Sequence, residues 1–218
     1  MKKWLRVFFV VNIIVVAVYA EYRGPAVRKE EKYDPYKSGG NGMGTLVDER
    51  DGHVYKTVKI GGQIWMAENL NYKTAGSYCY EYKESNCSKY GRLYRGKMII
   101  SDDHLCPDGW DLPADYEFGA LFHIVGGEEV AGKKLKSKNG WNKNGNGTDE
   151  FSFSVLPVGA MDDHSDFGSM GRYAGFWIGS FYNSGLIDMI SFDYVSNYVT
   201  IDYLSEYFGL SVRCIKKY

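Results

Sequence analysis

The sequence predicts an α+β domain, in which one main helix and a short second helix pack on a twisted antiparallel sheet with long loops. Three observations lead to this fold class. The 218 residues include 19 Tyr and 26 Gly, a mixture that favours strands and turns over helices. One amphipathic helical stripe lies in the middle of the chain, and the last third alternates apolar and polar residues with the period of two that strands show. A chain of this length is expected to form a single domain.

The first twenty residues have the layout of a secretory signal. Lys2, Lys3 and Arg6 give a positive start, an apolar run follows, and Ala20 places a small residue at the cleavage position. We expect residues 1–20 to be a cleaved signal peptide, which makes the protein exported and places it in the periplasm, on the cell surface or outside the cell. The alternative is an uncleaved anchor, although the stretch is shorter than the ~20 apolar residues that a membrane-spanning helix needs.

Residues 21–44 are predicted to be a flexible linker, and residues 45–218 the folded domain. The linker has a mixed-sign charge run over residues 28–32 and a Gly-rich segment over residues 38–42, neither of which can form a core. The net charge of the chain is −1, so nucleic acid is not an expected partner. Contact with a membrane is expected only if the signal stays uncleaved.

The folded part begins with a predicted hairpin. Order is expected from about Leu46, and residues 54–60 and 63–66 are predicted to form two strands around a pair of glycines, which permit the left-handed backbone of a tight turn. A helical turn is predicted over residues 67–70.

The chain contains four cysteines: Cys79, Cys87, Cys106 and Cys214. An even number in an exported chain is typical of disulfides, although four cysteines allow three pairings. The pair Cys79 and Cys87 is the local choice and closes a short polar loop, and Cys106 with Cys214 would then tie the middle of the chain to its end. A zinc site is the alternative, but the sequence has no C-x-x-C and only His104 beside Cys106.

The main helix is predicted over residues 113–125, where four apolar residues fall at positions i, i+3, i+4 and i+7 and two glycines follow the last of them. A second, short helix is predicted over residues 128–136.

From about residue 150 the apolar residues recur with a period of two. Phe151, Phe153 and Val155 alternate with serines and predict a strand. Further strands, which form an antiparallel meander, are predicted over residues 175–182, 187–194, 198–204 and 209–215.

Residues 142–149 are a weak candidate for a calcium site. Asn142, Asn144, Asn146 and Asp149 supply oxygen atoms at the kind of spacing found in an EF-hand loop. The first position is Asn, however, and the twelfth is Phe153 where an EF-hand has Glu, so the charge is low for a cation site. The sequence therefore predicts a turn-forming loop and no cofactor.

Many aromatic residues gather in the last third of the chain. The Phe and Trp residues are expected to be mostly core, whereas the hydroxyl group of Tyr favours surfaces that are half wet. We expect some of these side chains to form an exposed stacking platform for a glycan or a protein partner; the alternative is that they are ordinary cross-strand pairs. The candidate contact residues are Tyr173, Trp177, Tyr182, Tyr198 and Tyr203.

Four sequence blocks resemble one known family. They are YKTVKIGGQIWMAENLNY at residues 55–72, YGRLY at 90–94, CPDGWDLP at 106–113 and SVRC at 211–214. Taken together, the chain from about residue 45 to its end resembles the Fibrobacter succinogenes major paralogous domain family. The resemblance implies a bacterial exported domain with a C-type-lectin-like fold, related to the formylglycine-generating enzymes. It also implies that Cys106 and Cys214 form a long-range disulfide.

The sequence departs from the family pattern in two places. A short segment over residues 95–105 replaces a longer insertion, which puts ligand contacts there in doubt. Ala114 follows Pro113 where a Ser cap is usual, so the N-cap is expected to shift to Asp115.

No catalytic set can be named from the sequence. There is no H-E-x-x-H and no Ser-His-Asp order, and the acidic pairs Asp102-Asp103 and Asp162-Asp163 lie in polar loops. A formylglycine-type oxidase would need two free cysteines to bind copper, whereas every cysteine here has an expected disulfide role. We therefore expect a non-enzymatic recognition or adhesion module that binds a glycan or a protein. The alternatives are a degenerate formylglycine-generating-type enzyme and a structural component of the bacterial envelope.

Overall fold

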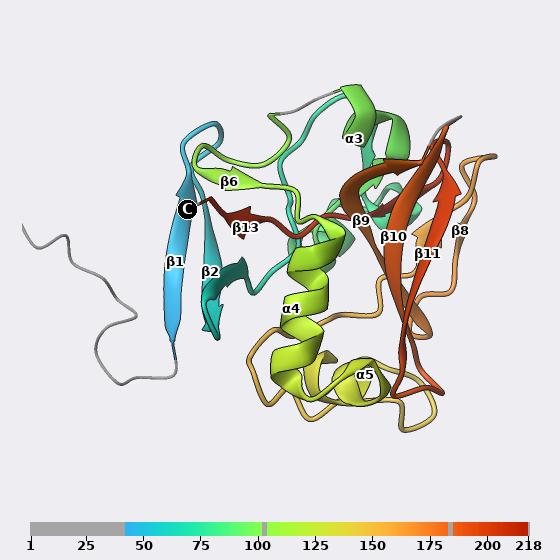
Figure 1. Ribbon diagram of the computed structural model, residues 1–218. Helices are drawn as coiled ribbons and strands as arrows, with labels where there is room; N and C mark the ends of the chain where they lie inside the picture. The colour runs from blue at the N-terminus through green and yellow to red at the C-terminus, as the bar shows by residue number, and fades with distance from the viewer. Residues whose placement is uncertain (1–41, 102–103, 183–184, 218) are drawn as a thin grey trace, which may run out of the picture. The chain divides into compact units, whose positions relative to one another are not determined.

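The computed structural model describes residues 42–101, 104–182 and 185–217, so the predicted signal at residues 1–20 and the linker up to residue 41 lie outside the described residues. The fold is α+β, with two sheets and a few short helices (Figure 1), which confirms the prediction of a mixed α+β domain. Among the described residues, no helix is both long enough and apolar enough to cross a membrane.

The first sheet has five strands in the order β1-β2-β3-β13-β6. The predicted hairpin is present as β2 and β3, which turn at residues 61–62. Met43 pairs with Val58 and Gly44 with Thr57, so both residues belong to the sheet, although the predicted domain begins at residue 45. The strands are β1 (Met43–Asp48), β2 (His53–Ile60), β3 (Gln63–Met66), β6 (Trp110–Asp111) and β13 (Ile215–Lys216).

The second sheet has eight strands, six of which follow the order β11-β10-β9-β12-β5-β4. Strands β9, β10 and β11 form the predicted antiparallel meander. The last predicted strand is divided: β12 runs parallel to β9, whereas β13 joins the first sheet. The division falls where the carbonyls of Val212 and Cys214 accept hydrogen bonds from Leu70 and Met66. The strands are β4 (Ser77–Tyr78), β5 (Leu93–Arg95), β7 (Ala160–Met161), β8 (Phe167–Gly168), β9 (Tyr173–Tyr182), β10 (Leu186–Asp193), β11 (Val199–Ser205) and β12 (Gly209–Ser211).

Both predicted helices are present, as α4 (Asp115–Val125) and α5 (Glu128–Leu135); Figure 1 shows α4 between the two sheets and α5 at the lower end of α4. The four apolar residues of the α4 stripe are buried. The N-cap of α4 is Ala114, not Asp115, and the Ala114 N–H donates to the Glu117 carboxylate at 2.8 Å, which is the half of a capping box that needs no cap side chain. The segments between β4 and β6 were not predicted to be helical; they hold η1 (Tyr80–Tyr82), α2 (Glu84–Tyr90) and α3 (Gly96–Ser101).

Two local predictions are wrong. Residues 151–155 do not form a strand, because Ser152 and Ser154 have left-handed φ values of 55° and 54°. The Asp149 carboxylate accepts hydrogen bonds from the Ser154 N–H and hydroxyl at 2.7 and 2.5 Å, in place of a strand partner. The alternation of apolar residues with serines over residues 151–155 reflects which side chains are buried, not a strand. Residues 67–70 form no helical turn, because the Leu70 N–H pairs with the carbonyl of Val212.

The core lies on both faces of β9. Phe176 and Ile178 point into one cluster, which also holds the apolar stripe of α4, and Trp177 points into a second cluster on the other face. The second cluster contains the disulfide between Cys106 and Cys214, which are 108 positions apart. Both faces of β9 are therefore covered by core residues in the middle of the strand, and neither is exposed to solvent.

A buried arginine lies between the two sheets. The Arg213 side chain is 1% exposed, and its guanidinium donates to the Asn69 Oδ1 atom at 2.6 Å and to the carbonyl of Phe153. The hydrogen bonds that it makes within the described residues all go to neutral oxygens. Burial lowers the pKa of Arg213, and the carboxylates of Asp149 and Glu68 oppose this effect.

A buried lysine follows α5 and gives the fold a pH dependence. Lys136 is 1% exposed, and its Nζ donates to the carbonyls of Asp193 and Ser196 at 2.8 Å each. Burial, helped by the charge of Lys133, lowers the pKa of Lys136 from 10.5 to about 8.

We expect the Lys136→Met variant to differ from the wild type in its pH dependence. Below about pH 8 the wild type keeps a charge in its interior, and the folded state loses that proton before the unfolded state does. The stability of the wild type relative to the variant should therefore rise by about 3 kcal/mol between pH 7 and 10.5. Urea unfolding of both proteins across this range measures the difference, and a difference that stays constant would contradict the assignment.

Candidate functional site

The structure separates the five side chains that were predicted to contact a ligand. Tyr198 and Tyr203, at β11, are exposed. Trp177 is fully buried and donates its indole N–H to the carbonyl of Tyr94 at 2.7 Å, so its assignment to a surface platform is wrong. Tyr173 packs against the second core cluster, and burial raises its pKa to about 12. The side chain of Tyr182 lies outside the described residues.

The correction at β9 has a physical reason. Alternation along a strand assigns side chains to two faces but does not show whether either face is wet. β9 is an interior strand with a core cluster on each face, so the Trp177 and Tyr173 side chains are directed inward. β11 is an edge strand, which leaves Tyr198 and Tyr203 at the surface.

A different group of aromatic residues forms an exposed cluster around Arg95. We call it the tyrosine surface, and it consists of Tyr78, Tyr82, Phe167 and Tyr207. Tyr82 is 63% exposed and Tyr207 is 58% exposed. The residues come from β4, η1, β8 and the turn after β11, so four separate segments converge on this one area.

The rings of the tyrosine surface hold one another in place. The Tyr82 and Phe167 ring centres are 4.9 Å apart with the planes at 86°, and Tyr82 meets Tyr78 at 6.2 Å and 81°. Edge-to-face contacts of this kind are favourable because the positive edge of one ring meets the negative face of the other. Tyr82 therefore projects into solvent in a defined orientation.

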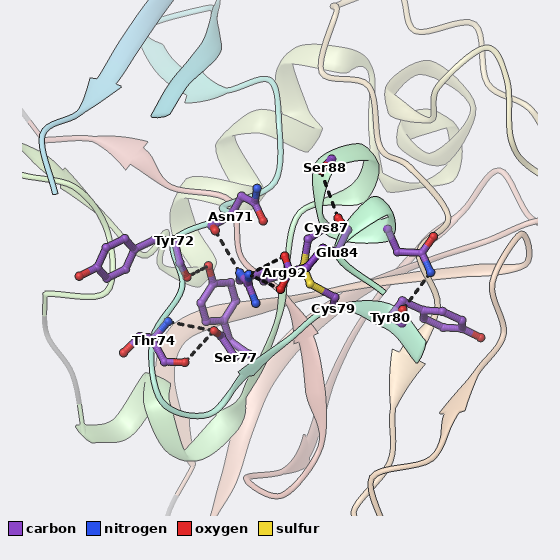
Figure 2. The surroundings of a disulfide bond; sticks show 12 residues. Asn71, Tyr72, Thr74, Ser77, Cys79, Tyr80, Glu84, Cys87, Ser88 and Arg92 are labelled. Atoms are coloured by element: carbon purple, nitrogen blue, oxygen red, sulfur yellow. Dashed lines mark hydrogen bonds and ion pairs between the residues drawn. A yellow bond between two sulfur atoms is a disulfide. The ribbon is translucent and has the colours of Figure 1, made fainter. Parts of the chain in front are cut away.

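The disulfide between Cys79 and Cys87 fixes the backbone that carries Tyr82. Glu81 and Tyr82 both have left-handed φ values, 54° and 55°, which are uncommon for residues other than glycine. Figure 2 shows the disulfide between Tyr80 on one side and Arg92 on the other. The Tyr80 carbonyl accepts a hydrogen bond from the Asn86 amide at 2.8 Å. A tight covalent loop thus keeps the unusual turn of Tyr82 in place.

Arg95 connects the tyrosine surface to a neighbouring loop. Its guanidinium donates to the Asp162 carbonyl and the Ser165 hydroxyl, each at 2.8 Å, and lies 5.7 Å from the centre of the Tyr78 ring. The Tyr82 hydroxyl donates to the Ser165 carbonyl at 3.4 Å. These bonds hold the loop of residues 162–166 beside the rings.

A pocket of about 360 Å³ opens beside Arg95. Met98 and the ring of Tyr207 supply apolar surface, whereas Asp163 and Glu206 supply carboxylates. Flat apolar surface next to fixed charged and hydrogen-bonding groups suits a ligand that has both apolar faces and hydroxyl groups. Lys97, Ser101 and Gly76 complete the pocket.

Two of the four side chains of the weak calcium candidate, Asn146 and Asp149, form hydrogen bonds within the protein. The Asn146 Oδ1 atom accepts a hydrogen bond from the Trp141 N–H at 2.9 Å, and the Asp149 carboxylate is bonded to Ser154. Lys143 and Asn144 adopt left-handed φ, as in a turn.

A second group, Asp162, Asp163 and His164, is close enough to share an ion, but the Asp162 Oδ1 atom already accepts hydrogen bonds from two backbone N–H groups. Asp102-Asp103 lies outside the described residues.

The fold, the two disulfides and the convergent rings define a two-sheet, disulfide-linked α+β domain. Both expected pairings, Cys79 with Cys87 and Cys106 with Cys214, are present. The sequence model of the Fibrobacter succinogenes major domain matches residues 58–216, and the chain belongs to this family. A comparison with curated proteins and a comparison with solved structures each give no match.

Sequence reasoning missed Tyr78, Tyr82 and Phe167, although it predicted the disulfide loop that carries Tyr82. Tyrosines occupy residues 78, 80 and 82, at every second position around the first half of a local disulfide. That repetition was the available signal. Nothing in the sequence indicated that Phe167 and Tyr207 come to the same region, because their approach depends on the long-range pairing of β12 with β5 and β7.

Proposed function

We propose that the protein is an exported, non-enzymatic recognition module that binds a glycan through the tyrosine surface. The observation that carries this proposal is the exposure of Tyr82 on a backbone that a disulfide, two ring contacts and Arg95 hold in place. A fixed aromatic ring loses little conformational freedom on binding, so more of the contact energy appears as affinity. A sugar has an apolar face that can cover such a ring and hydroxyl groups that can meet the carboxylates of Asp163 and Glu206.

We further infer a C-type-lectin-like scaffold. The family membership, the two sheets and the main helix α4 are in keeping with it. So is the long-range disulfide, which joins the segment that precedes α4 to the end of the chain. Export is inferred from the sequence of residues 1–20 and from the two disulfides, which persist in oxidising compartments.

A formylglycine-type oxidase remains the enzymatic alternative. All four cysteines are paired in the structure, which leaves no thiol pair for copper and supports a binding role. Thiol titration of the non-reduced protein separates the two proposals, because two titratable thiols would favour the enzyme.

The first test is a glycan array with the purified protein. Tyr82→Ala and Tyr207→Ala are each expected to weaken binding of a positive glycan about tenfold or more, as an exposed aromatic anchor does. Tyr116→Ala is the matched control, because Tyr116 is an exposed tyrosine on α4 that lines a different pocket. Equal losses in all three variants would reject the tyrosine surface as the site.

If the array gives no binder, a pull-down from envelope extracts tests for a protein ligand. A negative result in both experiments would contradict the recognition role. Recovery of the protein only in a stoichiometric surface assembly would favour the structural envelope component instead.

A further inference from the structure

A second hollow of about 400 Å³ lies on a different part of the domain, and it uses none of the residues of the tyrosine surface. We call it the polar cleft. One wall is formed by the start of β2 and the segment that follows β3, the second by the end of α2, and the third by residues 149–156. We propose that the polar cleft binds a single sugar unit through its hydroxyl groups, with the side-chain amide of Asn71 as the central contact.

The Asn71 side chain has hydrogen-bonding capacity that the described residues do not use. Its Oδ1 atom is buried and has no hydrogen-bond partner among them. A buried acceptor without a partner is costly, at about 1–3 kcal/mol, and native proteins seldom contain one. The χ2 torsion of asparagine is broad and two-fold, so a half-turn about it exchanges the Oδ1 atom with the NH₂ group and can turn either end of the amide to the cleft. A hydroxyl group of a ligand would satisfy it.

The backbone around Asn71 is fixed independently of its side chain. The Asn71 N–H donates to the Tyr55 hydroxyl at 2.9 Å, and the Asn71 carbonyl accepts from the Arg92 Nε at 3.2 Å. Figure 2 shows Arg92 between this carbonyl and the carboxylate of Glu84. The amide is therefore held at the cleft by contacts that do not involve it, as in a preorganised binding group.

The charges that line the cleft favour a neutral ligand. Glu68 pairs with Lys56 at 3.3 Å, and the carboxylates of Glu68 and Asp149 act on the buried guanidinium of Arg213 behind the wall. The carboxylates thus have cations of their own and remain acceptors for hydroxyl groups. Lys89 also lines the cleft, so charges of both signs are present and neither a free anion nor a free cation is favoured. A sugar, in contrast, can donate to carboxylates and accept from hydroxyls and amides.

The third wall is rigid and rich in hydroxyl groups. Ser152 and Ser154 face the cleft from a segment in which Asp149 and both serines have left-handed φ. Such backbone persists only where the surroundings enforce it, and it concentrates at functional sites. Here Arg213 and Asp149 enforce it through the hydrogen bonds described above.

The experiment is an NMR titration of the isotope-labelled, disulfide-intact protein with methyl glycosides of glucose, galactose, mannose and N-acetylglucosamine at millimolar concentrations. We expect at least one glycoside to shift the side-chain NH₂ signals of Asn71, which are assigned by their loss in Asn71→Ala. That variant should bind the glycoside about tenfold or more weakly. Asn71→Asp keeps an acceptor and should stay within about threefold of the wild type. Asn139→Ala, an exposed asparagine outside the cleft, is the matched control.

The outcomes separate this proposal from the proposed function. Asn71→Ala should remain folded, because the hydrogen bonds to Tyr55 and Arg92 involve only its backbone, and a cooperative thermal transition checks this. If no glycoside moves the signals of the cleft, or if Asn71→Ala binds as well as the wild type, the cleft proposal is overturned. In either case, glycan-array binding that is lost in Tyr82→Ala would still support the tyrosine surface as the glycan site of the proposed function. Loss of glycoside binding in Tyr82→Ala, with Asn71→Ala unaffected, would overturn the cleft alone.

Discussion

Replacing both Cys106 and Cys214 by alanine is expected to lower the free energy of unfolding by about 4–5 kcal/mol. The two residues are 108 positions apart. In the chain-entropy model, a bond that closes a loop of roughly 100 residues stabilises the folded state by about 4.7 kcal/mol, because it restricts the unfolded chain. Both sulfur atoms also lie in the second core cluster, so their removal leaves a small void. Urea unfolding without reductant measures the loss.

The matched control is the double replacement of Cys79 and Cys87. Their separation of 8 positions predicts a smaller loss, of about 2.5 kcal/mol in the same model. This variant should nevertheless weaken glycan binding, because it releases the left-handed turn that carries Tyr82. Equal losses of stability in the two double variants would show that loop entropy does not govern the contribution of these bonds.

Replacing Arg213 by alanine is the second change with a large expected effect, a loss of about 4 kcal/mol in the free energy of unfolding. The substitution leaves a cavity. It also leaves three acceptors, the Asn69 side-chain oxygen and the carbonyls of Phe153 and Ser154, without the hydrogen bonds that Arg213 donates to them. Buried acceptors without donors cost about 1–3 kcal/mol each, and relief of the buried charge offsets part of that cost. Urea unfolding gives the total.

Arg213→Met separates the cost of the cavity from the cost of the lost hydrogen bonds, because methionine fills much of the space and donates no hydrogen bond. We expect it to recover part of the stability but not the order of residues 149–154. Hydrogen exchange of the Ser154 N–H, which is bonded to Asp149, should accelerate in both variants. A methionine variant as stable and as protected as the wild type would show that the arginine does not hold this segment.

The sequence predicted the elements whose signals are local. The α4 stripe, the glycine turn of the first hairpin and the meander of β9 to β11 each depend on residues close together in the chain, and all three are present. The same reasoning failed at residues 151–155, where the burial of Phe153 imitates the alternation of a strand. There the hydrogen bonds that Ser154 donates to the Asp149 carboxylate determine the backbone.

The candidate sites were harder to predict because they depend on distant contacts. Alternation along SVRC would direct Arg213 to the face opposite Val212, yet both are buried, because the segment lies between the two sheets. Phe167 reaches Tyr82 only after β7 has paired with β8 and β4 with β5. The position of Tyr198 and Tyr203 near strand ends correctly predicted that they are exposed, whereas Tyr82 was not predicted.

The placement of β12 and β13 has a consequence for biosynthesis. β12 separates β9 from β5 in one sheet, and β13 separates β3 from β6 in the other. Ribosomes make proteins from the amino end, so neither sheet reaches its native strand order until residues 209–216 have emerged. Until those residues have emerged, the nascent polypeptide lacks the strand that joins the two parts of each sheet.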